Sequence, residues 1–426
     1  MSVLCESAAG WLLDQASFLR AAHPHSPAKA TDDKRVKQQH FHAYSFRAEF
    51  FQLFQPHLPS LSTAADLEEA EAPQIDQQRP KAKKRKRRYT ALNQGELDAL
   101  EYHAKISGLI KDGSMSLIQE GLNKGFLHPL SGKKENYSKS VPTELNDCCR
   151  LAELCEMSKH LHSLNEHELP TLVMEEVKRL SNSDLELLSH ITENNTDWTM
   201  IITLMGQKYL LPPKSSFLLS DISCMQPLLQ SNRKYDVIVL DPPWQNKSVK
   251  RSKRYGHLSS WQIKQIPIPE LAAADCLVVT WVTNRQKHLQ FVKNDLLPHW
   301  SVEVLAEWHW VKITRAGEFV FPLDSLHKKP YEVLVLGRVR RSTDSPSRET
   351  EADAFPLPNH KIIVSVPCML HSYKPPLAEI LQKYVKSEAK CLELFARSLQ
   401  PGWTSWGNEV LKFQHIDYFI SSETES

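Results

Sequence analysis

The pattern of apolar and polar positions changes near the middle of the chain, from helical spacing to strand-like runs. Between residues 93 and 199, apolar residues recur at i, i+3 and i+4, as in residues 96–103, which is typical of amphipathic helices. From Met200 onward, short apolar runs alternate with helical segments, a pattern that predicts an α/β fold. The strand candidates are residues 217–219, 236–240, 276–282, 302–313, 331–336, 361–366 and 390–395.

These patterns divide the 426 residues into four regions. Residues 1–90 mix His, Pro, Ser, Gln and charge and are predicted to be largely flexible, although an apolar stripe within residues 1–20 predicts an amphipathic docking helix. Residues 91–199 are predicted to form an α-helical domain. Residues 200–418 are predicted to form the α/β domain, with a flexible Pro/Ser-rich insertion at 340–359, and residues 419–426 a polar tail.

Composition narrows the functional classes. Charged residues make up 24% of the chain but the net charge is only +2, so any nucleic-acid contact has to come from local clusters. The eight cysteines are scattered without a Cys-x-x-Cys pair, which predicts reduced intracellular thiols and no metal site. No run approaches the roughly 20 apolar residues of a membrane span, and the N-terminal residues do not resemble a secretory signal. The absence of a glycine-rich phosphate loop disfavours a dinucleotide or nucleoside-triphosphate enzyme.

A basic run at residues 81–88 contains six consecutive Lys and Arg residues, from Lys83 to Arg88. Such a run in a segment predicted to be flexible favours nuclear targeting or nucleic-acid contact. A solvated charge run is the alternative. We therefore expect a nuclear protein, with cytosol and mitochondrion as weaker alternatives.

The motif richest in chemistry is Asp241-Pro242-Pro243-Trp244, directly after the apolar run 235–240. Ligands of open α/β sheets bind at the carboxyl ends of such strands. The Asp241 carboxylate and a backbone carbonyl of the Pro-Pro turn, preferably that of Pro242, could accept both N–H groups of an exocyclic amine, while Trp244 stacks on its ring. The alternative is a strand-ending turn without chemistry.

Other polar residues suit an organic cofactor. Asp221 and Ile222, after the strand candidate 217–219, could bond and pack against an adenine ring. Lys374, before a helix that begins Pro-Pro, suits a carboxylate. Polar residues Asn408 and Glu409 could bond a ribose.

A basic loop follows the Asp-Pro-Pro-Trp turn and predicts contact with nucleic acid, with a solvated loop as the alternative. Strand tryptophans such as Trp310 either belong to the core or line a base pocket. The predicted nucleic-acid contacts are Lys247, Lys250, Arg251, Lys253, Arg254, Tyr255 and Trp310.

The ordered set of motifs over about residues 200–415 resembles the family of eukaryotic adenine-N6 methyltransferases. The set comprises Ser220-Asp221-Ile222, Asp241-Pro242-Pro243-Trp244, Tyr255-Gly256, Trp281-Val282-Thr283, Trp310-Val311-Lys312, Lys374-Pro375, Glu393-Leu394-Phe395-Ala396-Arg397 and Gly407-Asn408. Ser398-Leu399-Gln400 depart from the Pro-His-Asn stretch of the messenger-RNA enzyme.

This resemblance implies a Rossmann-like fold, S-adenosylmethionine as methyl donor and adenine N6 of RNA or DNA as acceptor. It implies cofactor contacts by Asp221, Ile222, Asp241, Lys374, Arg397, Asn408 and Glu409, the last three near the ribose. The branch is associated with 2′-O-methyladenosine in small nuclear RNA and with DNA adenine.

Three functional hypotheses follow. The first is an active N6-adenine methyltransferase. The second is a catalytically weak or inactive nucleic-acid-binding scaffold of the same family. The third is methyl transfer to protein nitrogen or a small molecule, which the basic residues between positions 247 and 254 disfavour. A protein partner is left open.

Overall fold

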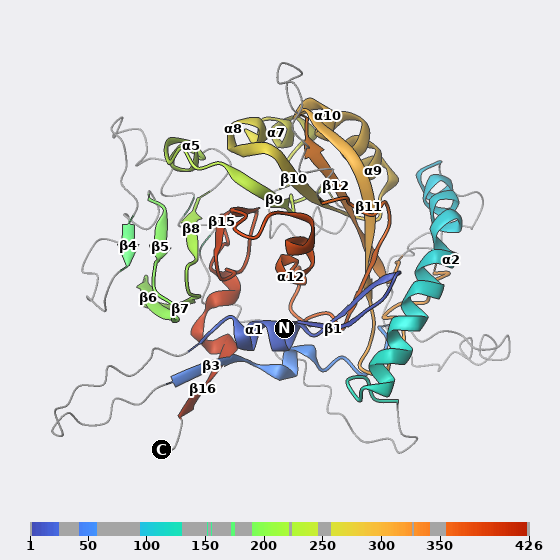
Figure 1. Cartoon of the computed structure of the whole chain (residues 1–426). Coiled ribbons are helices and arrows are strands. Elements are labelled where there is room, and N and C mark those ends of the chain that lie inside the picture. The colour runs from blue at the N-terminus through green and yellow to red at the C-terminus, as the bar shows by residue number, and fades with distance from the viewer. Residues whose placement is uncertain are drawn as a thin grey trace, which may run out of the picture.

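The computed structural model describes residues 2–24, 42–57, 94–129, 151, 155, 172–174, 190–220, 224–245, 257–325, 328–340 and 355–423. Within these residues a sheet of twelve strands runs through the molecule, in the order β1-β2-β13-β11-β12-β10-β9-β14-β15-β8-β5-β4 (Figure 1). Two further strand pairs, β3 with β16 and β6 with β7, lie outside it. The Rossmann-like α/β fold predicted from the sequence is confirmed.

The strands of the main sheet are β1 (Val3–Glu6), β2 (Gly10–Leu13), β4 (Leu172–Met174), β5 (Thr192–Asn194), β8 (Ser216–Leu219), β9 (Tyr235–Leu240), β10 (Ala272–Val282), β11 (Val302–Lys312), β12 (Tyr331–Val339), β13 (Ile362–Ser365), β14 (Cys391–Leu394) and β15 (Trp403–Gly407). The separate pairs are β3 (His42–Phe46) with β16 (Phe419–Glu423) and β6 (Met200–Leu204) with β7 (Gln207–Leu211).

The helices are α1 (Gln15–Ala21), α2 (Gln94–Asn123), α5 (Gln226–Gln230), α7 (Ser260–Lys264), α8 (Ile268–Leu271), α9 (Gln286–Phe291), α10 (Leu297–His299) and α12 (Ala378–Leu381). Short 3-10 turns are η1 (Ala48–Phe51), η6 (Gln382–Tyr384), η7 (Lys412–Gln414) and η8 (Ile416–Tyr418), and η5 (Val292–Leu296) is a π-helical turn between α9 and α10. None of the described helices is long and apolar enough to cross a membrane.

The centre of the sheet is parallel and covered on both faces. Strands β10, β9, β14, β15 and β8 run in the same direction. Ile238 and Leu240 of β9 pack in one core with residues of α7 and α9, whereas Val237 and Val239 pack in a second core with residues of α12. Burial on both faces explains why β9 is a continuous apolar run instead of an alternating one.

The N-terminal residues are part of the sheet, which corrects the prediction of an amphipathic docking helix in a flexible region. β2 pairs in parallel with β13, and Trp11, Leu12 and Leu13 are buried. The apolar run that we interpreted as a helical stripe is a strand covered on both sides, and only the short α1 follows it. The remainder of residues 1–90, including the basic run 81–88, lies outside the described residues.

The interval 91–199 and the C-terminal tail also differ from the prediction. α2 contains the helical spacing of residues 96–103, but β4 and β5 of the same interval join the far edge of the main sheet. The tail forms β16 on β3, with Phe419 buried, so it is not only a polar extension. Of the insertion at 340–359, residues 341–354 lie outside the described residues.

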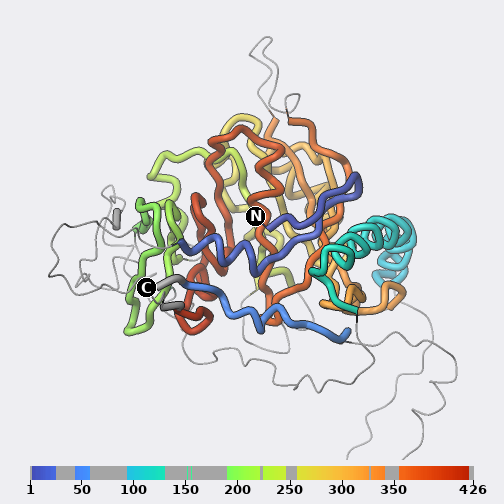
Figure 2. The backbone as a smooth tube through the Cα atoms, turned by 60° about the horizontal axis from the view of Figure 1, so that its bottom comes forward, coloured from blue at the N-terminus to red at the C-terminus, as the bar shows by residue number. Residues whose placement is uncertain are grey.

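Helix α2 covers the N-terminal hairpin and the adjacent strands of the sheet (Figure 2). Its Ile110 and Leu117 are fully buried. A polar contact fixes the docking, because the Tyr102 hydroxyl lies 2.5 Å from Glu307 Oε1, to which it donates, and 2.9 Å from His309 Nε2. α2 is therefore part of the same folded body as the sheet.

Gly10 makes the closest approach between the hairpin and the sheet, and this generates a stability prediction. A Cβ at Gly10 would lie 1.8 Å from the Ile362 carbonyl oxygen, whereas one at Gly108 of α2 would meet nothing within 4 Å. We expect Gly10→Ala to lower the free energy of unfolding by about 3 kcal/mol. Gly108→Ala, the matched control, should raise it by about 0.5–1 kcal/mol. Urea unfolding followed by circular dichroism measures both, and a wild-type midpoint for Gly10→Ala would contradict the prediction.

Candidate active site

The polar residues of the candidate site gather at the carboxyl edge of the parallel strands. Asp241 follows β9, Phe395 follows β14 and Glu409 lies two residues after β15. They are brought together because β9, β14 and β15 are adjacent and parallel. A small cavity opens at this edge, and its wall includes Asp241, Ser372, Lys374, Pro375, Pro376, Glu393, Phe395, Arg397, Gln400 and Phe413.

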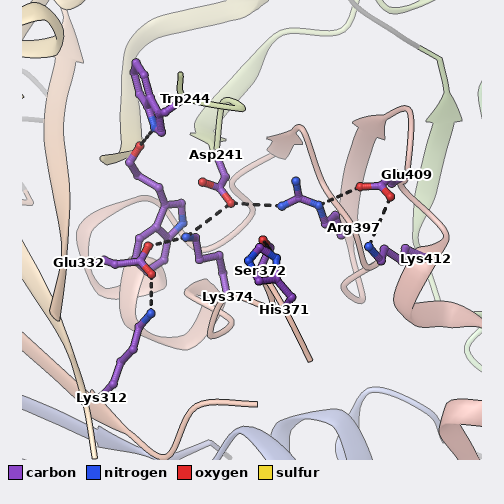
Figure 3. A network of polar contacts seen from close by, with 11 residues as sticks. Asp241, Trp244, Lys312, Glu332, His371, Ser372, Lys374, Arg397, Glu409 and Lys412 are labelled. Carbon is purple, nitrogen blue, oxygen red and sulfur yellow. Dashed lines mark hydrogen bonds and ion pairs between the residues drawn. The ribbon is translucent and has the colours of Figure 1, made fainter. Parts of the chain in front are cut away.

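The Asp241 carboxylate lies between two cations (Figure 3). Its Oδ2 is 3.6 Å from Lys374 Nζ and 3.6 Å from Arg397 Nη1. The Asp241 side chain is only 16% exposed, so both attractions act in a poorly solvated place. Both distances exceed a hydrogen bond, so the ion pairs orient the carboxylate while leaving it able to accept other donors.

Each flanking cation has a second carboxylate. Lys374 Nζ donates to Glu332 Oε2 at 2.5 Å, and Lys312 donates to the other oxygen of Glu332 at 2.5 Å. Burial opposes the charge on Lys374, but the carboxylates of Asp241 and Glu332 outweigh it and raise its pKa. Burial likewise opposes the charge on Glu332, but the two lysines outweigh it and hold its pKa well below the usual range.

On the other side, Arg397 is held by Glu409. The guanidinium Nε donates to Glu409 Oε2 at 3.1 Å, and Lys412 Nζ lies 3.4 Å from the other oxygen. Glu409, predicted from sequence as a ribose contact, thus positions Arg397. Asn408 is exposed at the end of β15.

The Pro-Pro turn is rigid and internally bonded. The Trp244 backbone N–H donates to the Pro242 carbonyl at 2.8 Å, and Leu258 N–H donates to the Pro243 carbonyl at 3.2 Å. A carbonyl oxygen has two lone pairs, so Pro242 keeps one for an incoming N–H group.

Trp244 does not stand free as a stacking plane, which corrects the prediction for this residue. Its indole is 5% exposed, donates from Nε1 to the Trp281 carbonyl at 2.9 Å and packs beside the His288 ring at 5.1 Å. A large apolar ring is most stable in the core, so here it anchors the turn.

Trp310 was predicted as a nucleic-acid contact and is a core residue instead. It is 1% exposed and donates from Nε1 to Ser365 Oγ at 2.9 Å. Lys312 Nζ lies 4.3 Å from the centre of its ring, so Trp310 supports the lysine that binds Glu332.

Several predicted site residues lie outside the described residues. They are Asp221, Ile222, Lys247, Lys250, Arg251, Lys253, Arg254 and Tyr255.

Sequence reasoning assigned no role to Glu332, Lys312, Glu393, Gln400 and Lys412. Burial, aided by the nearby Asp241 charge, raises the pKa of Glu393 to about 7, and Gln400 Nε2 donates to its Oε2 at 2.8 Å. A signal did exist for Glu332, which is the single acidic residue of β12, a strand whose one other charged residue is Arg338. An acidic side chain in such a strand needs a charged partner.

Known proteins match this region. The MT-A70 family model matches residues 235–409, from β9 to just past β15. The human N(6)-adenine-specific methyltransferase METTL4 is 65% identical over 344 residues, covering 80% of this chain and 72% of the human protein.

More distant relatives match about half of the chain. The N6-methyladenosine RNA methyltransferase MTA1 of Pyricularia oryzae is 36% identical over 230 residues, covering 51% of this chain and 58% of its own. The DNA N6-methyl methyltransferase of Caenorhabditis elegans is 34% identical over 215 residues, covering 50% and 56%. The family resemblance predicted from the motifs is confirmed, and the chain belongs to the MT-A70 family of methyltransferases.

Proposed function

We propose that this protein is an S-adenosylmethionine-dependent N6-adenine methyltransferase that acts on nucleic acid. The main support for this proposal is the position of the Asp241 carboxylate. It lies at the carboxyl end of β9, on the wall of the cavity, and is oriented by Lys374 and Arg397. The names of the relatives support a nucleic-acid acceptor, since one is an RNA and another a DNA methyltransferase. We further propose 2′-O-methyladenosine of small nuclear RNA or DNA adenine as acceptors, and the nucleus as location from the basic run at 83–88.

Asp241 and the Pro-Pro turn supply what the adenine amino group needs. The N6 lone pair is delocalised into the purine ring, so N6 is a weak nucleophile. Asp241 accepts one N–H and the free lone pair of the Pro242 carbonyl accepts the other, which draws electron density onto N6 and fixes its direction. A paired base would first have to leave its stack or be presented in a single strand. The methylated nitrogen then releases its proton to solvent.

The charged groups on the cavity wall suit the amino-acid end of S-adenosylmethionine. Lys374 has three N–H donors and can serve a carboxylate in addition to Asp241 and Glu332. Asp241 and Glu393 can accept from an ammonium group, while Phe395 offers an apolar wall. Arg397, Asn408 and Glu409 would lie near the ribose. When bound, the cofactor supplies the electrophilic methyl group.

Removal of the Asp241 charge tests the mechanism. Asp241→Asn keeps the shape, and Glu332 and Glu409 still pair with Lys374 and Arg397, so we expect a wild-type fold. The turnover number should fall by about 10²-fold or more, because the negative charge is lost and an NH2 donor replaces one of the two acceptor oxygens. Transfer of a radiolabelled methyl group to adenine-containing single-stranded RNA and DNA measures it.

Asp197→Asn is the control, since that side chain is 82% exposed. Undiminished transfer by Asp241→Asn would refute the mechanism. The alternative is a nucleic-acid-binding scaffold without activity. It predicts that the wild-type protein binds nucleic acid but gives no heat when titrated with S-adenosylmethionine and transfers no methyl group.

Glu393 makes the charge of the pocket depend on pH. Burial raises its pKa to about 7, so the carboxyl is mostly neutral at pH 6 and mostly ionised at pH 8. The ionised form attracts the sulfonium cation. We therefore expect the affinity for S-adenosylmethionine to rise several-fold from pH 6 to pH 8 relative to Glu393→Gln, which has no titrating group there. Isothermal titration calorimetry measures the affinity of both proteins for S-adenosylmethionine at each pH. Ionisation of the ligand itself affects both proteins equally, so it cancels in the comparison. Parallel pH profiles for the two proteins would contradict the prediction.

The acceptor polymer is identified by nucleoside mass spectrometry of cells with and without the protein. Total RNA, genomic DNA and organellar DNA are digested separately. We expect the doubly methylated adenosine, carrying both N6 and 2′-O methyl groups, to fall in the RNA pool when the protein is absent, because small nuclear RNA is the proposed acceptor. A fall confined to a DNA pool would replace RNA by DNA as the acceptor.

A further inference from the structure

A surface groove is lined by residues of α7 on one side and of α9 with η5 on the other. Helices α7 and α9 lie in the upper part of Figure 1. Trp261 of α7 and Phe291 of α9 form its apolar part. Trp261 is 69% exposed, more than any other large apolar side chain in the described part of the chain. Covering this indole with a ligand would remove apolar surface from water and would therefore be favourable.

Both walls of the groove are attached to the Asp-Pro-Pro-Trp turn. The Leu258 N–H donates to the Pro243 carbonyl at 3.2 Å, and the capping box of Ser259 and Gln262 starts α7 one residue later. On the opposite wall, Arg285, the N-cap of α9, donates from Nη1 to the Gln245 carbonyl at 3.2 Å. Trp261 is three residues from Leu258, so the Cα atoms of the two residues are at most about 10 Å apart. The groove therefore lies near the Asp-Pro-Pro-Trp turn that follows β9.

The polar groups of the groove favour a nucleic acid as occupant. Lys287 is exposed on its wall, whereas Lys264 is paired with Asp295 at 3.0 Å. Gln290 and Asn294 add amides that can donate to phosphate or base edges. An aromatic platform beside a cation is the arrangement by which proteins bind single strands without reading their sequence. Two aromatic side chains among charged and amide groups are too little apolar surface for a stable protein interface.

We propose that this groove binds the single-stranded nucleic acid that flanks the target adenosine, with a neighbouring base stacked on Trp261 and a phosphate beside Lys287. The inference rests on the proposed function, since it names the path of the substrate into the same site. It also assigns the stacking role to Trp261 in place of Trp244.

The test compares substitutions of Trp261 in the full chain. Fluorescence anisotropy with a labelled, adenine-containing single-stranded oligonucleotide gives the Kd. We expect Trp261→Ala to weaken binding by about 10-fold and Trp261→Tyr, which keeps an aromatic face, to weaken it by less than about 3-fold. Ile201→Ala, on the 42% exposed Ile201 of β6, is the control and should leave the Kd unchanged.

Methyl transfer supplies an independent readout. For Trp261→Ala, KM for the oligonucleotide should rise with the Kd, whereas kcat at saturation and S-adenosylmethionine affinity stay at wild-type values, because Trp261 is not in the cavity of Asp241. Lys287→Gln should weaken binding and reduce the slope of log K against log salt by about one.

Three outcomes would overturn the inference or separate it from the proposed function. If Trp261→Ala binds the oligonucleotide as the wild type does, the groove proposal is wrong, even where methyl transfer stands. If the wild type transfers no methyl group, the proposed function is wrong, and the anisotropy comparison alone still decides the groove. If Trp261→Ala changes the molar mass by light scattering but not the Kd, the groove is a protein contact and the proposal is wrong.

Discussion

Alternating charge at the carboxyl edge of the sheet is the constraint on which the site depends. A carboxylate placed between two poorly solvated cations is stable only if each cation has another partner, because desolvation of unpaired charges costs several kcal/mol. Here the alternation runs without a break through Lys312, Glu332, Lys374, Asp241, Arg397, Glu409 and Lys412. Its four cations exceed its three carboxylates, so the edge tolerates the carboxyl group of Glu393 and still suits an anionic group of a ligand.

The strand order makes this alternation possible. β12 is antiparallel to both β10 and β11, so its first residues lie at the edge where β10 and β11 end. Glu332, at the start of β12, therefore faces Lys312, at the end of β11, and both lie at the edge occupied by Asp241. A parallel strand in that place would have put its first residues at the opposite edge, leaving Lys374 with Asp241 alone. The antiparallel direction of β12 thus supplies Lys374 with its second carboxylate partner, Glu332.

How far the sequence predicts the structure depends on whether the signal is local. The apolar run of β9 and the polar residues after it are neighbours in sequence, and they predicted the fold and the position of Asp241. The hairpin was missed because β2 pairs with β13, about 350 residues away, and local periodicity does not contain that pairing. Trp310 was misplaced for a related reason: a strand aromatic is buried or exposed according to its neighbours in space.

The two tryptophans beside the Pro-Pro turn have opposite environments, and this explains how the turn can be rigid and still accessible. Trp244 is fixed by the Trp281 carbonyl and the His288 ring, so the backbone carbonyl that we propose as an acceptor for adenine has a defined direction. A ring held in this way cannot also move to meet a flexible strand. Trp261 belongs to a short helix whose start is bonded to the same turn, and its indole points to solvent. With the stacking role that we propose for Trp261, anchoring of the turn and stacking of a base belong to different side chains.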